Sequence, residues 1–361
     1  MKFQVKIFLV NFGTLILLLF IFSPQTYADY SITELRSLGN SNNLTSATKI
    51  NNNGQIIGRC TLTSSQKNFA CLWDNGNIKP IINFGSDMDG VTATDINDQG
   101  QIVGSITKSN SNGFQQIPFL WKKGKYTDLS SLFPQNSRPT PAAINNNGQI
   151  VGSFCINPNC QTHAFLINHG TLTDLGSFSG DYSSATDIND NGQIVGTYGW
   201  ISKGRAHGFI WQNGTMIDLE DVNSTDNVQV AGINNSGQIA GSRQINSATD
   251  WQAFRWDSGV FTNLGDLNNV TPNPHYSLAK GINDNGEIVG ESNYVDQSGV
   301  AYLRAFLWKN GNIINLGSLV QGSSSYSSAT NINNNEKIVG YNWGYYNNDS
   351  SQFFLKALLW Q

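Results

Sequence analysis

A unit of 44 to 50 residues occurs seven times along the chain, and this repetition constrains the fold more than any other feature. Each copy carries an Ile-Asn pair, a short turn and a run similar to Gln-Ile-Val-Gly. The copies start near residues 46, 92, 141, 184, 229, 278 and 328, and their asparagines are Asn51, Asn97, Asn145, Asn189, Asn234, Asn283 and Asn333. A period of this size is typical of propellers and solenoids.

Each copy contains four segments with the turn residues and apolar pattern of short β-strands. In the fourth copy these are residues 183–189, 193–198, 207–211 and 215–219, which we label strands A, B, C and D. Asn-Gly and similar turns separate A from B and C from D, and they favour hairpins because Asn and Gly accept a positive φ. Four antiparallel strands per copy predict one propeller blade per copy.

The two ends of the chain complement each other. The last copy stops at strand C, within residues 356–361, and residues 30–35 have the strand D pattern with no strand C before them. Pairing of these segments would close a ring and leave no open sheet edge. The sequence therefore predicts that residues 29–361 form one all-β domain, a seven-bladed β-propeller whose last blade is closed by the N-terminal strand. An open solenoid is the alternative, and it would need caps.

The repeated Ile-Asn-Asp/Asn-x-Gly-Gln-Ile-Val-Gly motif, followed by a motif such as His163-Ala164-Phe165, resembles the extracellular repeat proteins called the HAF family. The resemblance covers essentially all of the chain after residue 28. It implies an exported repeat protein, but it implies no reaction and brings no catalytic residues.

The first 28 residues are expected to be a signal peptide. Lys2 and Lys6 give a positive start, residues 7–22 are mostly apolar, Ser23-Pro24 would end a helix, and Thr26-Tyr27-Ala28 fits a cleavage site. An uncleaved membrane anchor is the alternative, although the run is short for a span of about 20 residues. The mature protein is therefore expected to be secreted, periplasmic or extracellular, with no membrane span.

Charge excludes one class of partner. Without Lys2 and Lys6 the chain has 19 basic and 25 acidic residues, a net charge of −6, and no basic cluster. Nucleic acid is therefore not an expected partner, since phosphate neutralisation needs grouped Lys and Arg. The chain has no nucleophile elbow, zinc-protease helix or phosphate-binding loop. We expect no cofactor, no metal and a monomer.

The four cysteines predict two local disulfides in an exported chain. Cys155 and Cys160 flank a turn-forming tetrapeptide, and a two-residue turn at Ser65-Gln66 would place Cys60 opposite Cys71. A zinc site with four cysteines is the alternative, but neither pair has the usual short spacing.

Residues that recur in every copy are interpreted as structural. Phe119, Phe165, Phe209, Phe254 and Phe306 share one position of strand C, and a Trp usually stands two residues later, on the same side of the strand. We expect these rings to pack neighbouring blades together. His163 and His207 occupy a position that is freely replaced in other copies, and the acid or amide of strand D is expected to form hydrogen bonds at strand ends.

A binding surface is expected where the copies differ. The A–B and C–D turns are short and uniform, whereas the B–C and D–A loops vary, as loops on a binding face do. Several combine aromatic and polar residues, which suit sugar rings or a protein partner. The candidate ligand-binding residues are Tyr198, Trp200, Arg205, Tyr294, Trp343, Tyr345 and Tyr346.

Two functions follow from these loops. The favoured one is a non-catalytic binding or scaffold protein that presents its variable loops to a glycan or a surface protein. The alternative is a propeller glycoside hydrolase or polysaccharide lyase acting through loop acids such as Asp181, Asp226, Asp296 or Asp349, although the sequence assembles no acid/base pair. A purely structural envelope or matrix component is a third possibility.

Residues 187–192 also fit the first half of a calcium loop, but the other copies argue against that interpretation. The Glu expected at the twelfth position is Tyr198. The first ligand position is Asp in two copies only: Lys49, Asp95, Ala143, Asp187, Gly232, Gly281 and Asn331. We therefore interpret the stretch as the A–B hairpin, with adventitious cation binding at Asp95 or Asp187 as the lesser alternative.

Overall fold

The computed structural model describes residues 3–12, 15–24, 30–38, 44–62, 67–82, 88–110, 113–178, 180–200, 204–219, 227–245, 250–267, 275–296, 298–319, 325–345 and 353–361. The chain divides into two compact units, residues 1–31 and residues 32–361. We describe each unit by itself.

The first unit is a two-stranded antiparallel sheet rather than a helix. Its strands are β1 (Phe3–Phe12) and β2 (Leu15–Pro24), and their register runs from Phe3 opposite Pro24 to Phe12 opposite Leu15. The expectation of a helix ending at Ser23-Pro24 is therefore wrong for this structure. The physical reason is composition, since the segment is rich in Ile, Val and Phe, which favour extended backbone. In the described parts of the chain, no helix has the length and apolar character needed to span a membrane.

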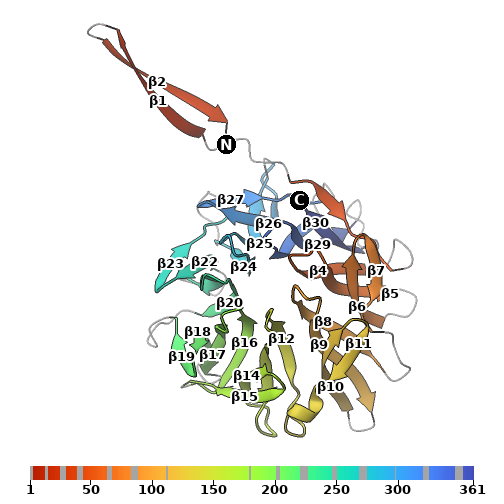
Figure 1. Cartoon of the computed structure of the whole chain (residues 1–361). Coiled ribbons are helices and arrows are strands. Elements are labelled where there is room, and N and C mark those ends of the chain that lie inside the picture. Colours follow the sequence, from red (N-terminus) through yellow and green to blue (C-terminus); the bar gives the residue numbers. More distant parts are fainter. Residues whose placement is uncertain are drawn as a thin grey trace. The chain divides into compact units, whose positions relative to one another are not determined.

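The second unit consists of antiparallel β-sheets arranged around a centre (Figure 1). Four sheets are each built from four consecutive strands. These are β12 (Thr140–Ile144), β13 (Ile150–Cys155), β14 (Thr162–Asn168) and β15 (Thr171–Gly176); β16 (Tyr182–Ile188), β17 (Ile194–Trp200), β18 (Arg205–Gln212) and β19 (Thr215–Asp218); β20 (Val228–Ile233), β21 (Ile239–Gln244), β22 (Trp251–Asp257) and β23 (Val260–Asn263); β24 (Ser277–Ile282), β25 (Ile288–Val295), β26 (Ala301–Lys309) and β27 (Asn312–Asn315). The predicted order A–B–C–D is therefore observed in these sheets.

Two further sets of four strands join into one eight-stranded sheet. Their strands are β4 (Leu44–Ile50), β5 (Ile56–Leu62), β6 (Lys67–Asp74), β7 (Asn77–Pro80), β8 (Gly90–Ile96), β9 (Ile102–Asn110), β10 (Gly113–Lys122) and β11 (Lys125–Asp128). The sets meet through a single parallel pairing, Asn68 with Gly90. A short 3-10 helix, η1 (Ser130–Leu132), follows β11.

The last four-stranded sheet is closed by the N-terminal strand. It contains β28 (Ser325–Ile332), β29 (Ile338–Tyr345), β30 (Phe353–Trp360) and β3 (Ile32–Glu34). Strand β3 pairs antiparallel with β30, with Ile32 opposite Trp360 and Glu34 opposite Leu358. The predicted pairing of residues 30–35 with the C-terminal strand is therefore observed, and the all-β class is confirmed.

Every strand A carries a β-bulge three residues before the recurring Asn. In β16, for example, Ala185 faces Gly196 but the next paired residue is Asp187, which faces Val195. The same shift occurs in β4, β8, β12, β20, β24 and β28. Bulges re-aim the side chains that follow them, and the residue after the bulge is the one that had suggested a calcium loop.

The core lies between neighbouring sheets and uses the recurring rings. Phe209 of β18 is buried in one cluster with Ala164 and Leu166 of the preceding sheet. The recurring Gly of strand B is needed because Phe209 faces Gly196, where an added Cβ would lie 2.8 Å from the Phe ring and 2.1 Å from the Ser184 carbonyl oxygen. The repeated Gly and the repeated Phe therefore form one packing unit, as the structural interpretation of these rings predicted.

Both predicted disulfides are present, and one predicted register is wrong. Cys60 is bonded to Cys71, and Cys155 to Cys160. Cys60 faces Phe69, however, and Cys71 faces Gly58. Strand β5 ends at Leu62 and β6 begins at Lys67, so four residues connect them rather than the predicted two-residue turn. The pair is diagonal, with a Cα–Cα distance of 6.0 Å, which a disulfide spans.

Candidate functional site

The second unit has two faces with different chemistry. In a sheet of the order A–B–C–D, the A–B and C–D turns fall at one end of the strands and the B–C and D–A connections at the other. We call the first the turn face, which includes the A–B turns such as residues 189–193. We call the second the loop face, which includes the B–C and D–A connections such as residues 156–161 and 129–139.

On the turn face, the recurring asparagines form a closed ring of hydrogen bonds. Each side-chain Nδ2 donates to the main-chain oxygen of the recurring Asn in the next copy, at 3.0 to 3.1 Å, and Asn333 donates to Asn51 to complete the circle. All seven side chains are buried. The ring therefore ties together the residues at the start of every A–B turn.

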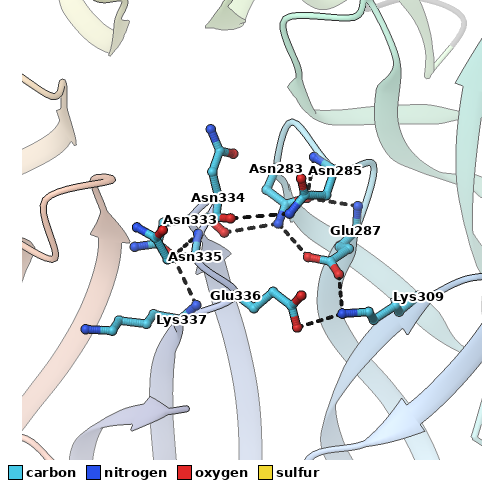
Figure 2. Close-up of polar contacts among 9 residues, drawn as sticks. All are labelled: Asn283, Asn285, Glu287, Lys309, Asn333, Asn334, Asn335, Glu336 and Lys337. Carbon is cyan, nitrogen blue, oxygen red and sulfur yellow. Dashed lines mark hydrogen bonds and ion pairs between the residues drawn. The ribbon is translucent and has the colours of Figure 1, made fainter.

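The same asparagine also folds its own turn. The Oδ1 of Asn283 accepts hydrogen bonds from the main-chain N–H groups of Asn285 (3.1 Å) and Glu287 (3.0 Å), while its Nδ2 donates to Glu287 at 2.7 Å and to the main-chain oxygen of Asn333 at 3.0 Å (Figure 2). An Asp could accept the first two bonds but could not donate the last two. This double use explains why Asn recurs in all copies.

A second ring lies one residue further on and contains four amides and three acids, which alternate except where Asn334 is followed by Asn52. Each residue's main-chain N–H donates to the side-chain Oδ1 of its neighbour in the next copy, at 2.8 to 2.9 Å, through Asn52, Asp98, Asn146, Asp190, Asn235, Asp284 and Asn334. The Asp98 Oδ2 accepts from the amides of both Asn52 and Asn146. Each carboxylate therefore accepts hydrogen bonds from the side-chain amides on both sides of it. These contacts indicate a structural role for the acids.

One junction of this ring carries an ion bridge. Lys309 lies 2.7 Å from Glu287 Oε1 and 2.6 Å from Glu336 Oε2, so it joins the last two sheets (Figure 2). Burial by itself would lower the pKa of Lys309, but the hydrogen bonds and charges of Glu287 and Glu336 outweigh it and raise that pKa. Glu336 has a φ of 60° at the turn position that Gly occupies in the other copies.

At the centre of the ring lies an open cavity of about 160 Å³, whose lining includes three charged residues of strand A as well as the three acids of the second ring. Lys49, Asp95 and Asp187 each follow a bulge and line this cavity. Burial raises the pKa of Asp95 to about 6, against the opposing charge of Lys49, and it also raises the pKa of Asp187. Burial would lower the pKa of Lys49, but the two carboxylates outweigh it and raise that pKa. The sequence analysis placed these three residues at equivalent positions of the copies and considered cation binding only at Asp95 or Asp187; it did not predict that they form one buried charge cluster.

The two central carboxylates bind main-chain groups of the neighbouring sheet. Asp187 Oδ2 accepts from Ile233 N at 2.9 Å, Asp95 Oδ2 accepts from Ile144 N at 2.9 Å, and Asn331 uses its Oδ1 in the same way on Ile50 N at 3.1 Å. Among the residues that the structure describes, no group of three His, Cys, Asp or Glu side chains is placed to hold a metal ion. The interpretation of residues 187–192 as a hairpin agrees with these contacts.

The candidate ligand residues of the loop face fall into three groups. In the first, Tyr198 is fully buried, donates to Asp218 Oδ2 at 2.7 Å and contacts the Trp200 ring at a centroid distance of 5.7 Å. Trp200 lies opposite Arg205 in the register of β17 and β18, and both are half-buried. Tyr198 therefore supports this part of the loop face from beneath.

The other two groups lie in adjacent sheets and meet at Arg304. Tyr294 faces Tyr302 in the β25–β26 hairpin, and the Arg304 guanidinium lies 4.3 Å from the centre of the Tyr302 ring. Arg304 also donates to the main-chain oxygen of Ser325 on β28, next to Tyr326. The sheet of β20–β23 separates these two groups from Tyr198, Trp200 and Arg205.

The third group belongs to the sheet of β28–β30. Trp343 is stacked on Tyr326, with a centroid distance of 4.4 Å and an interplanar angle of 17°. Tyr345 is exposed and contacts the exposed Phe353 ring at 5.7 Å. Tyr346, the remaining candidate, lies outside the described residues.

Exposed apolar side chains distinguish the loop face from the turn face. Nine large hydrophobic side chains of the described residues are exposed, and six of them belong to the B–C or D–A connections or to the strand ends beside them: Phe114, Ile156, Phe178, Val300, Tyr345 and Phe353. The other three lie on strand D, where Val260 is next to a C–D turn of the turn face, and none of the nine belongs to an A–B turn. Of these six residues, the sequence analysis had named only Tyr345 as a candidate. A single apolar residue in a loop does not indicate a binding surface until the structure shows which face of the sheets it lies on.

The loop acids of the hydrolase alternative do not form a pair in the described structure. Hydrogen bonds from the Ser298 hydroxyl and from the Val300 N–H, among others, lower the pKa of Asp296 to about 2. A general acid needs a raised pKa. Asp181 lies in another sheet's D–A loop, and Asp226 and Asp349 lie outside the described residues.

No protein-family model matches the sequence, and comparison with curated proteins gives no significant match. Among solved structures, the chain is similar to the β-propeller domain of the Trilobed protease from Pyrococcus furiosus, with a TM-score of 0.57 and 10% identity, over 89% of this chain and 94% of that one. It is also similar to YCF48 bound to D1 peptide (TM-score 0.47, 9% identity, 93% and 97% covered) and to putative TolB from Agrobacterium tumefaciens (0.43, 10%, 64% and 86%). At this identity the likeness shows the fold alone, and the second unit is a β-propeller.

Proposed function

We propose that this protein is an exported, non-catalytic β-propeller that binds a glycan or a surface protein through its loop face. The single observation that carries the proposal is the placement of exposed apolar side chains on that face and away from the A–B turns. Exposed aromatic and aliphatic side chains among polar residues are typical of recognition surfaces. The turn face, by contrast, uses its polar groups to hold the sheets together.

Seven blades are part of the same proposal. The seven-membered asparagine ring supports counting β4–β7 and β8–β11 as separate blades, because each contributes its own asparagine, Asn51 and Asn97. The single parallel pairing between Asn68 and Gly90 is then a contact between two blades rather than a merger.

Export and family membership rest on sequence and disulfides. The repeat resembles the HAF family, and residues 1–28 have the pattern of a signal peptide. Two disulfides suit an oxidising compartment outside the cytoplasm.

The test compares a loop-face variant with a variant on strand D. Tyr345→Ser with Phe353→Ser removes an exposed aromatic pair from the loop face, whereas Val260→Ser removes an exposed side chain from β23. We expect the first variant to lose binding to a glycan array or to intact cells, and Val260→Ser to bind as the parent does. Equal binding by both variants, with matched thermal unfolding, would reject the loop face as the binding surface.

A further inference from the structure

The loop face contains a groove of about 820 Å³ beside the helix η1. One wall is the start of β10, with Phe114, Gln115 and Gln116, and the other is the D–A connection of residues 130–139. The Phe114 ring is 80% exposed, the highest value among the large hydrophobic side chains that are described. An aromatic face therefore stands open to solvent at the edge of a cavity.

The D–A wall of the groove is held in shape by its own contacts. Ser137 donates from its hydroxyl to the Pro134 main-chain oxygen at 2.7 Å, and its own main-chain oxygen accepts from Cys155 N. Cys155 is in turn bonded to Cys160. The wall is thus anchored to a disulfide-closed hairpin of the same sheet, so little ordering is needed when a ligand binds.

Arg138, in this wall, adopts a backbone conformation that is unfavourable for a residue with a side chain. Its φ is 45°, in the left-handed region that costs a residue with a side chain about 1 kcal/mol and costs Gly almost nothing. In the C–D turns the same conformation is required by the two-residue hairpin, as at Lys123 with a φ of 49°. Arg138 lies in no such hairpin, and its side chain is exposed and lines the groove. Because Gly would be the less strained residue at this φ, the presence of Arg138 here points to a use of its side chain.

The chemistry of the lining selects the kind of ligand. Arg138 is the one charged residue among the described residues that line the groove, and the others include four primary amides, Gln115, Gln116, Gln135 and Asn136. The nearby Asp128 accepts a hydrogen bond from Ser130 N at 2.7 Å. Primary amides both donate to and accept from vicinal hydroxyls, and a guanidinium binds a carboxylate through two parallel hydrogen bonds.

We propose that this groove binds an oligosaccharide that carries carboxylates, such as a uronate chain. Arg138 binds a carboxylate, the Phe114 ring packs against the apolar face of a sugar, and the amides bind its hydroxyls. The inference rests on the proposed function, because it assigns a ligand class and a location to the loop face.

The test uses the purified protein and a panel of oligouronates built from galacturonate, glucuronate, mannuronate and guluronate. Calorimetric titration should show saturable binding of at least one member, and its methyl ester should bind about tenfold or more weakly, as expected when a charge-assisted hydrogen-bond pair is lost. Hexaglutamate, an acidic peptide, should not compete. Saturable binding of no member, equal binding of the ester, or stronger binding of hexaglutamate would each overturn the proposal.

Two matched variants separate binding from folding. Arg138→Gly removes the guanidinium and relaxes the backbone, so we expect affinity to fall about tenfold or more while the melting temperature stays equal or rises. Lys123→Gly makes the same change at a similar φ on the turn face and should leave affinity unchanged. An Arg138→Gly variant that binds like the parent would overturn the assignment. If the panel fails but Tyr345→Ser with Phe353→Ser still abolishes cell binding, the proposed function stands and this inference alone falls.

Discussion

At the residue scale, one asparagine per copy performs two tasks that usually need separate residues. Its Oδ1 closes the A–B turn and its Nδ2 reaches the next copy, so local folding and assembly of the ring depend on the same side chain. The following turn position is Asn in some copies and Asp in others, but at the recurring position no other side chain offers an acceptor and a donor at this length.

Asn145→Asp tests this double role. The variant keeps the acceptor for Asn147 N and Gln149 N, but it places an oxygen where the amide now donates to the Asn189 main-chain oxygen at 3.0 Å. We expect the free energy of unfolding in urea to fall by about 2–3 kcal/mol at neutral pH. Asn147→Ser, which removes an exposed bond to the Asp190 oxygen, should cost less than about 1 kcal/mol. Equal losses in both variants would contradict the role of the ring.

Asp95 should make the free energy of unfolding fall as the pH rises. A salt-bridged acid, whose pKa is lowered in the folded state, has the opposite effect. Its pKa is raised from 3.8 to about 6 by burial, so the folded protein holds a proton that the unfolded chain releases between those values. The stability that this proton contributes is complete below about pH 4 and is lost by about pH 6, at most about 3 kcal/mol. Unfolding free energy measured at steps from pH 4 to 7 should therefore fall more steeply in the parent than in Asp95→Asn.

Asn fits at this position, so Asp95→Asn removes the titrating group without a change in the shape of the side chain. Asn331 occupies the equivalent place and accepts from Ile50 N, as Asp95 accepts from Ile144 N. Asp187, whose pKa is also raised, remains in the variant and retains part of the slope. An unchanged slope in Asp95→Asn would show that Asp95 is ionised throughout this range.

At the element scale, the four-strand unit could be predicted from sequence because its signals are local. Turn residues, alternation and the repeated Gly and Phe all lie within one copy, and the closure by residues 30–35 followed from what the end copies lack. The bulge in strand A could not be predicted, because no residue type marks it. Without the bulge, Lys49, Asp95 and Asp187 could not be recognised as neighbours in one cavity.

Pairings between strands C and D also escaped the sequence analysis. The variable first position of strand C contacts the acid or amide of strand D: His163 Nδ1 lies 2.9 Å from Asp174 and Lys356 Nζ lies 3.0 Å from Glu34. His207 at the same position is buried, with its Nδ1 3.7 Å from Asp218. These positions were interpreted separately. In the register, the acid of strand D faces the recurring Phe or Leu position, as Asp174 faces Phe165 and Glu34 faces Leu358, so its contact with the first position of strand C is diagonal.

The Gly of strand B gives a test of the element itself. Gly196→Ala would place a Cβ 2.1 Å from the Ser184 carbonyl oxygen and 2.8 Å from the Phe209 ring. Either the pairing of strands A and B or the Phe209 side chain would then have to move. We expect a loss of about 3 kcal/mol in unfolding free energy by urea titration. Gly90→Ala, in β8, meets nothing within 4 Å and should change stability by less than about 1 kcal/mol. Similar losses at both positions would contradict the packing role of Gly196.

At the scale of the whole second unit, the ring depends on its N-terminal segment at two sheets. Strand β3 covers the edge of β30, and Leu35 N donates to the Ala357 oxygen at 2.9 Å. Two residues after β3, the Arg36 main-chain oxygen accepts from the Trp73 indole at 2.7 Å, which belongs to the next sheet. Residues 32–36 therefore complete one sheet and bridge it to its neighbour.

Truncation separates this closing segment from the part expected to be removed on export. A chain that begins at residue 30 keeps every contact of β3, and we expect it to melt as the full chain does. A chain that begins at residue 39 exposes the backbone edge of β30 together with the Trp360 and Trp73 rings that are now buried. An uncovered edge strand pairs with other chains, so this variant should melt at a lower temperature and should self-associate with rising concentration in sedimentation experiments. If it stays monomeric with an unchanged melting temperature, the N-terminal strand does not hold the ring closed, and the C-terminal sheet is stable with three strands.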